Sequence, residues 1–294
     1  MLAAIEAGGT KFVLAVAHTP DKILDHIRLD TKHPDETMAE VIAYFRQAEK
    51  RFGTPISKLG IGAFGPITID PKSPDYGVLG DTGKVKWIGA SFPERLAEFK
   101  VPMKIDTDVN GSGIGEALKG AGEGLSLIAY VTVGTGVGIG ITRNGSPMHD
   151  GISPFEMGHV YPPRHPEDDF PGNCPPHGPC LEGLACGPSI KERWGTDLSS
   201  LPSDHIGLKF EAHYLGHLAQ MIILTHAPDR IVFGGGVMKT PGLMDMVREK
   251  AEQLLNGYIR HERLDPGLKT YICPPSLDDL AGIQGALYLA EQAV

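Results

Sequence analysis

The sequence predicts an α/β protein made of two units with a similar plan. Short apolar runs suited to strands alternate with amphipathic segments suited to helices. A strand, a glycine-rich turn and a second strand occur twice, first over Leu2–Ala7 and Phe12–Ala17, then over Leu127–Val133 and Val137–Thr142. The length of 294 residues is sufficient for two domains, each with its own core.

The remaining elements follow from their apolar patterns. In the first unit we expect a strand over Lys22–Asp30, a helix over Glu36–Phe52, a strand over Lys58–Phe64, a helix near Phe92–Phe99 and a strand over Met103–Asp106. In the second we expect a helix from about Val109, an irregular segment over Pro154–Pro188, a helix over Ile206–Thr225, a strand over Arg230–Phe233, a helix over Leu243–Tyr258 and a helix over Asp279–Ala293.

These elements predict domain boundaries at 1–108 and 109–278. The helix within 279–294 is rich in small residues, which suit close packing, and we expect it to pack back on the first domain.

The net charge, the apolar runs and the cysteines indicate which kinds of partner to expect. A formal net charge of −9 argues against non-specific nucleic-acid binding, which requires a basic surface. No apolar run is long enough for a membrane span, and the N-terminal stretch lacks the pattern of a signal peptide. Four cysteines, three of them between Cys174 and Cys186, do not suggest a disulfide scaffold. We therefore expect a cytoplasmic protein with a small-molecule partner.

Three glycine-rich turns are candidate nucleotide-binding sites, the first of them suited to phosphate. They are Gly8-Gly-Thr-Lys11, Gly134-Thr-Gly136 and Gly234-Gly-Gly236. Glycines let backbone N–H groups approach an anion closely, and Glu6, just before the first turn, could hold Mg²⁺. Each turn alone is equally compatible with an ordinary tight turn. None has the spacing of a Walker loop or of a dinucleotide-binding turn.

Asp108 is the candidate general base. It follows a short strand and precedes a helix, so it is either an N-cap or the acceptor of a proton from an attacking hydroxyl. Asn110 and Glu116 are candidates for supporting this turn.

A third pattern predicts a metal site. His159, Cys174, His177 and Cys180 supply two nitrogen and two sulfur ligands, the composition of a closed structural zinc site. The Cys-x₂-His-x₂-Cys spacing allows one short loop to surround an ion. The alternative is a mobile loop with unrelated cysteines, and we favour zinc because all four ligands fall in a segment without a core of its own.

Taken in order, these motifs resemble the actin-like ATPase superfamily, which has a ribonuclease H-like fold. The three glycine-rich runs resemble its phosphate-1, phosphate-2 and adenosine motifs, and Thr107-Asp-Val-Asn resembles the loop with the catalytic aspartate of its sugar kinases. The resemblance implies two α/β domains around a cleft that binds ATP and Mg²⁺. The implied ATP and Mg²⁺ residues are Glu6, Gly8, Gly9, Thr10, Lys11, Gly134, Thr135, Gly136, Pro188, Gly234, Gly235, Gly236, Val237 and Met238.

The segment from Glu156-Met-Gly-His159 to Cys180-Leu-Glu182 is similar to the signature of ROK kinases and repressors. His177 stands where many members have cysteine, as in the bacterial zinc-containing fructokinases of this family. This resemblance implies a homodimeric fructokinase that makes fructose 6-phosphate from fructose and ATP. The implied sugar-binding residues are Gly65, Pro66, Thr107, Asp108, Glu156, His159 and Glu182.

Two residues depart from the common family pattern. Glu6 replaces an aspartate, and Thr107 replaces an asparagine before Asp108. Both departures argue against a glucokinase or an N-acetylmannosamine kinase more strongly than they argue against sugar-kinase activity in general. The alternatives are a ROK glucokinase or mannokinase of broader hexose specificity, a sugar-sensing ROK regulator and an actin-like ATPase of assembly. A regulator would carry a helix-turn-helix, for which we expect no room before Glu6.

Overall fold

A five-stranded mixed sheet forms the centre of the first of two units in the computed structural model, which describes residues 1–149, 153–264 and 266–294. Unit 1 comprises Met1–Gly115, His149–Pro154 and Asp279–Val294, and unit 2 comprises Glu116–Met148 and Phe155–Asp278. The division at residue 108 stays a prediction. Among the described helices, none combines the length and apolar character that crossing a membrane requires.

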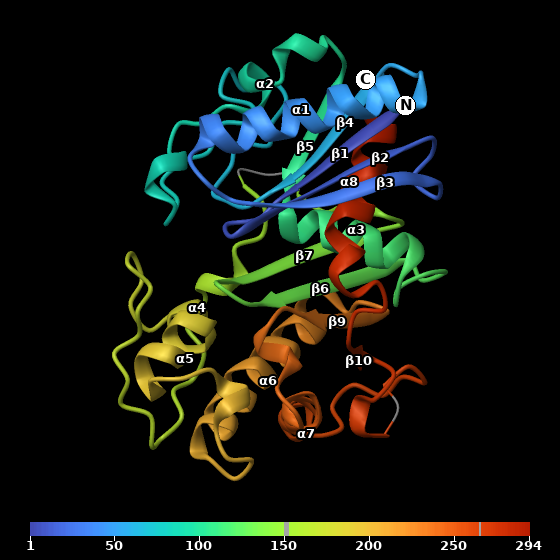
Figure 1. Ribbon diagram of the computed structural model, residues 1–294. Helices are drawn as coiled ribbons and strands as arrows, with labels where there is room; N and C mark the ends of the chain where they lie inside the picture. The colour runs from blue at the N-terminus through green and yellow to red at the C-terminus, as the bar shows by residue number, and fades with distance from the viewer. Residues whose placement is uncertain (150–152, 265) are drawn as a thin grey trace. The chain divides into compact units, whose positions relative to one another are not determined.

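The sheet of unit 1 has the order β3-β2-β1-β4-β5 (Figure 1). Its strands are β1 (Leu2–Ala7), β2 (Lys11–Ala17), β3 (Ile23–Asp30), β4 (Lys58–Ala63) and β5 (Met103–Thr107). The first three are antiparallel, whereas β4 and β5 run parallel to β1. The predicted hairpin around Gly8 and Gly9 is confirmed.

The alternation of side chains along β1 separates two cores. Ala3, Ile5 and Ala7 pack in one cluster with helix α1 (Pro34–Phe52), whereas Leu2 and Ala4 pack with α8 (Ala281–Gln292). Glu6 has the parity of Leu2 and Ala4, so its side chain falls on the α8 face of the sheet. Figure 1 shows α8, in red, running along the strands of this sheet.

Helix α8 approaches the sheet closely because small residues line the contact. A Cβ added at Gly60 of β4 would lie 1.9 Å from the carbonyl oxygen of Ala286. The helix is shorter than predicted at its start, because Asp278–Leu280 form a 3₁₀ turn.

Helices α1 and α2 also differ in their bounds from the sequence prediction. Helix α1 starts at Pro34, with His33 as its N-cap, two residues before the predicted start. The helix expected over Phe92–Phe99 is divided into α2 (Phe92–Arg95) and a 3₁₀ turn, because Leu96 leaves helical geometry with φ −105° and ψ 7°.

Helix α3 (Asp108–Lys119) begins one residue earlier than predicted. The N-cap alternative for Asp108 is wrong, because Thr107 fills that role. The backbone N–H of Asn110 donates to Thr107 Oγ1 over 3.2 Å. Asp108 is the first helical residue.

Unit 2 contains a second five-stranded sheet with the order β10-β9-β6-β7-β8. Its strands are β6 (Leu127–Val133), β7 (Val137–Arg143), β8 (Ser146–Pro147), β9 (Arg230–Gly234) and β10 (Ile272–Cys273). The predicted hairpin of β6 and β7 is confirmed, and β9 runs parallel to β6. The strands β8 and β10 escaped prediction because two residues carry no periodicity.

Four helices complete unit 2: α4 (Leu181–Ala185), α5 (Gly187–Trp194), α6 (Ile206–His226) and α7 (Leu243–Leu255). They share one apolar core with the alternate residues Leu127, Ala129 and Val131 of β6. The expectation of an irregular segment over Pro154–Pro188 is wrong at its end, where α4 and the first turn of α5 lie. Helix α7 stops before the predicted Tyr258, because Asn256 adopts the left-handed conformation with φ 46°.

Glu116 is a buried anchor for the chain just before α8. Its carboxylate accepts hydrogen bonds from the backbone N–H groups of Ala121 (2.7 Å), Ser276 (3.1 Å) and Leu277 (2.8 Å), and the residue is fully buried. A single side chain thus satisfies three backbone donors, and it fixes the chain at Ser276 and Leu277.

We expect Glu116→Gln to lower the free energy of unfolding by about 2–3 kcal/mol. The amide retains one acceptor oxygen, whereas its NH₂ group would face backbone donors that then lack a partner. Denaturant titration measures the effect, with the exposed Glu123→Gln as control. An equal midpoint for both variants would contradict this role of Glu116.

Candidate active site and metal centre

Three candidate segments of unit 1 lie at one edge of its sheet. Ala7, Ala63 and Thr107 are neighbours in a single row across the parallel strands β1, β4 and β5. These three strands therefore end at the same edge of the sheet. Gly8, the turn at Gly65 and Pro66, and Asp108 follow them and lie at that edge. In α/β sheets the carboxyl ends of parallel strands are where ligands bind.

The turn between β1 and β2 is held by its own backbone and by the chain after β3. Gly8 N–H donates to the carbonyl of Lys11 (2.9 Å), and Thr31 donates its hydroxyl to the Gly8 carbonyl (2.7 Å) and its N–H to the Thr10 carbonyl (3.0 Å). The turn is thus fixed without any bound group.

Glu6 is a buried acid beside this turn. Its Oε2 is buried and has no hydrogen-bond partner among the described residues. Burial raises the pKa of Glu6 to about 7, with Lys11 opposing this shift and Asp108 and Asp279 adding to it. The glycine at position 282 of α8 leaves space for this side chain, because a Cβ there would lie 2.4 Å from the Glu6 carboxyl carbon. A buried, unpaired carboxylate oxygen fits the oxygen ligands that Mg²⁺ takes.

A buried network orders the turn that carries Asp108. Asp106, which is 2% exposed, accepts hydrogen bonds from Asn110 Nδ2 (2.7 Å) and from Thr107 N–H (2.8 Å). Its second oxygen lies 2.9 Å from Nε2 of His149. Asp108 Oδ1 accepts from the N–H of Val109 over 2.8 Å. The sequence prediction included Asn110 as support but missed Asp106 and His149, which are distant in the chain.

In unit 2 the second and third glycine runs lie side by side. A Cβ at Gly235, whose φ is 93°, would lie 2.3 Å from the carbonyl oxygen of Val133, the last residue before the second run. Gly187, which precedes Pro188, donates its N–H to the Gly134 carbonyl over 2.7 Å. The candidate nucleotide residues of this unit are therefore brought together, and glycine is required at 235 by both conformation and space.

The candidate sugar-contacting acids also lie near these turns. Glu182 Oε2 accepts from the N–H of Val137 over 3.0 Å, and a Cβ at Gly136 would lie 2.6 Å from the same oxygen. Burial raises the pKa of Glu156, with His159 opposing the shift and Glu182 adding to it. Glu156, His159 and Glu182 thus lie within electrostatic reach of one another.

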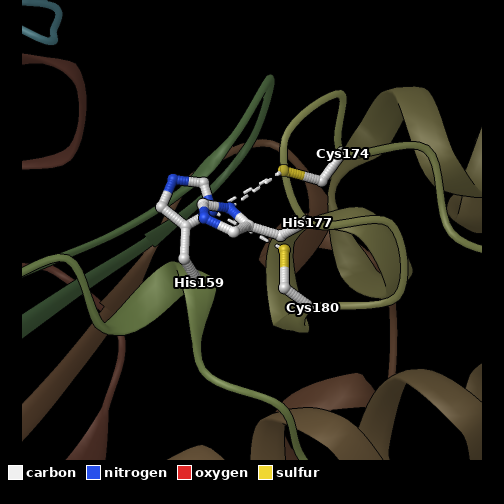
Figure 2. A group of neighbouring side chains, drawn as sticks. All are labelled: His159, Cys174, His177 and Cys180. Atoms are coloured by element: carbon white, nitrogen blue, oxygen red, sulfur yellow. Dashed lines mark hydrogen bonds between the residues drawn. The ribbon is translucent and has the colours of Figure 1, made fainter.

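The four predicted metal ligands converge (Figure 2). Their ligand atoms all lie within 4.8 Å of one another. Cys174 Sγ is 3.7 Å from Nδ1 of both His159 and His177, and Cys180 Sγ is 3.6 Å from Nδ1 of His159. In a tetrahedral zinc site, bonds of about 2.3 Å to sulfur and about 2.0 Å to nitrogen imply sulfur–nitrogen separations of about 3.5 Å. The four residues therefore fit zinc.

Contacts at the start of α4 hold the four ligands in place. Gly183 N–H at the start of α4 donates to Cys180 Sγ (3.4 Å), and a Cβ at Gly183 would lie 1.9 Å from the carbonyl of Gly178. Burial raises the pKa of the Cys180 thiol to about 11. Burial thus disfavours the charged thiolate, and a metal ion that binds the thiolate would offset this unfavourable free energy. Because His159 directs Nδ1 at the sulfurs, Nε2 is the nitrogen left for another contact.

The ROK family matches residues 2–293. The chain belongs to the ROK family. It is 40% identical over 290 residues to a fructokinase of Zymomonas mobilis, covering 97% of this chain and 95% of that protein. It is 38% identical over 295 residues to a fructokinase of Pediococcus pentosaceus, covering 100% and 99%. The expected resemblance is confirmed.

The fold agrees with that of solved ROK structures. A ROK hexokinase from Thermus thermophilus superposes with a TM-score of 0.77 at 21% identity, covering 99% of this chain and 98% of that one. Together with the two mixed sheets, this confirms the predicted actin-like ATPase fold. The assignments of individual ROK site residues remain predictions.

Proposed function

We propose that the chain is an ATP-dependent fructokinase that transfers the γ-phosphoryl group of ATP to the 6-hydroxyl of fructose. Full-length relatives at 38% and 40% identity named fructokinase support this proposal most strongly. The convergence of Gly8, Gly65 and Asp108 at one sheet edge supports it from the structure, because phosphoryl transfer depends chiefly on positioning.

Asp108 acts as general base in this proposal. Its carboxylate accepts the proton of the fructose hydroxyl while the hydroxyl oxygen bonds to the γ-phosphorus and the bond to the β-phosphate oxygen breaks. The network of Asp106, Asn110 and His149 keeps the start of α3 fixed, so that Asp108 needs no rearrangement before the reaction.

The glycine-rich turns bind the nucleotide. Gly8–Lys11 in unit 1 and Gly134–Gly136 in unit 2 bind the phosphates through backbone N–H groups other than those of Gly8 and Gly134, which donate within their own turns. Gly234–Met238 with Pro188 bind the adenosine side. Glu6 holds Mg²⁺ directly or through water. When bound, Mg²⁺ neutralises phosphate charge that develops in the transfer.

The sugar is bound by Glu156, His159 and Glu182, together with Gly65, Pro66 and Thr107. His159, Cys174, His177 and Cys180 hold zinc, which supplies structural order here and performs no step. Since His159 presents Nδ1 to the sulfurs, the metal would fix the direction in which Nε2 meets the sugar. We also propose a cytoplasmic homodimer with no nucleic-acid or membrane partner.

A hexokinase of broader specificity is the second candidate, because the ROK hexokinase of Thermus thermophilus has the same fold. Coupled measurement of ADP release on fructose, mannose and glucose with Mg·ATP separates the candidates. We expect kcat/KM for fructose to exceed that for the other hexoses by at least about tenfold. Comparable values would favour the hexokinase. The absence of sugar-dependent ADP release would contradict both and favour a regulator or another ATPase.

A further inference from the structure

A cavity of about 460 Å³ opens beside the first glycine turn, within unit 1. One wall is the chain after β3, from Thr31 to His33 with Glu36, and the other is the loop Gly83–Trp87. Lys32, Lys84 and Lys86 line it, so its walls are predominantly cationic. An anion is the ligand that this charge favours.

Both walls are tied to the predicted active-site segments. Thr31 donates to the carbonyls of Gly8 and Thr10, as described above. The loop that carries Lys84 is fixed at one end by Gly80, whose N–H donates to the carbonyl of Pro66 over 2.8 Å. At the other end Trp87 Nε1 donates to the carbonyl of Lys32 over 2.9 Å. The loop therefore bridges the sugar turn and the phosphate turn.

The burial of Trp87 fixes the position of the loop that carries Lys84. The residue is 2% exposed, and its ring centroid lies 5.3 Å from that of Phe12, which directly follows Lys11. Trp87 N–H donates to the carbonyl of Lys84 over 2.7 Å. The backbone of Lys84 is thus held by a core residue, although its side chain is exposed.

The side chain of Lys84 lies directly over the phosphate turn. A Cβ at Gly9 would be 3.2 Å from Lys84 Cε, the carbon that carries the ammonium group. The absence of a side chain at Gly9 therefore makes space for the stem of Lys84. No such contact with Gly9 is found for Lys86, within the part of the chain that the structure describes.

The distribution of charge singles out Lys84. Lys11 Nζ lies 3.8 Å from Asp279, and Lys32 Nζ lies 2.6 Å from Glu40. Lys84 has no carboxylate partner among residues 1–149, 153–264 and 266–294. Within the described residues, the Lys84 side chain thus reaches the turn at Gly9 without an ion pair to offset its charge.

We propose that Lys84 is a further catalytic residue, which binds the terminal phosphate of ATP and neutralises its charge during transfer. The role rests on the proposed kinase function. It assigns Lys84 and Lys11 different tasks: Lys11 pairs with Asp279 and stabilises the turn, whereas Lys84 contacts the phosphoryl group that moves.

The test compares Lys84→Met, Lys84→Arg and, as control, Lys50→Met, which removes the charge of an exposed lysine in the last turn of α1. Methionine keeps the length of the stem over Gly9 but removes the charge. We expect Lys84→Met to lower kcat about 100-fold, Lys84→Arg to recover part of this loss, and Lys50→Met to stay within about twofold of the wild type. Thermal unfolding verifies that all variants are folded.

Calorimetric titration with Mg·ATP and Mg·ADP gives a second measurement that needs no turnover. Only ATP carries the terminal phosphate, so Lys84→Met should weaken ATP binding about tenfold and leave ADP binding unchanged. Wild-type kcat together with wild-type ATP affinity in Lys84→Met would overturn the assignment. A wild-type protein that binds ATP but phosphorylates no hexose would refute the proposed function instead, and Lys84 would then be judged by the ATP and ADP affinities.

Discussion

Asp108→Asn is expected to lower kcat for fructose phosphorylation by about 10³-fold, because a positioned general base contributes roughly 10²–10⁴ to the rate. Asparagine has nearly the same shape, and its Oδ1 can still accept from the N–H of Val109. It cannot take up the proton of the attacking hydroxyl. The loss should therefore appear in kcat, while calorimetric affinity for fructose stays within about threefold of the wild type.

A control variant and a stability measurement show whether the loss of kcat is specific to Asp108. Asp204→Asn removes an exposed carboxylate before α6 and should leave kcat unchanged. Denaturant titration of Asp108→Asn should give a midpoint close to that of the wild type, because the hydrogen bonds of Asp106 and Thr107 remain. If Asp108→Asn kept more than a tenth of wild-type kcat, the assignment of the base would be wrong.

Removal of one metal ligand should have the second large effect. In Cys174→Ser a hydroxyl replaces a buried thiolate, and the remaining three ligands no longer close a tetrahedral site. We expect about one equivalent of zinc in the wild type, much less in the variant, and a fall of about 100-fold in kcat/KM for fructose. The reason is that metal-binding free energy, which orders the loop bearing His159, is lost.

Cys273→Ser is the matched control, since Cys273 lies in β10, outside the cluster. It should retain zinc and activity. Affinity for Mg·ATP should stay close to the wild-type value in Cys174→Ser, because the glycine turns do not belong to the metal loop. A metal-free wild type with full activity, by elemental analysis and assay, would contradict a structural role for zinc.

Local patterns were sufficient for most of the fold. Both strand–turn–strand openings, the long helices α1 and α6 and the parallel strand β9 arise from clear apolar periodicity, and their predicted bounds differ from the structure by at most two residues. The metal cluster was predictable as well, because three of its ligands lie within seven residues and share a loop. Errors occur where an element is too short to show periodicity, as in β8 and α4, or where a short strand pairs with a distant segment, as β10 does with β9.

The same limit applies to the site. The partnership of Asp106 with His149 joins residues 43 positions apart, and nothing in either local sequence indicates it. Lys84 belongs to a glycine–lysine pair that lacks the Walker spacing, so sequence alone gave it no role. Its relevance comes from the fold, which places the loop from Gly80 to Trp87 over Gly9. Thr107, and not Asp108, is the N-cap of α3, because the Thr107 hydroxyl accepts the hydrogen bond from the N–H of Asn110.

The packing of α8 on the first sheet bears on how the chain matures during synthesis. Leu2, Ala4 and Ala15 have their apolar partners in Ile283, Leu287 and Ala290, which are synthesised after all of unit 2. Until α8 has been synthesised, one apolar face of the sheet in unit 1 is exposed and can associate with other chains. Unit 1 is therefore completed only after the residues of unit 2 have been synthesised, and removal of α8 should impair solubility without removing any predicted binding residue.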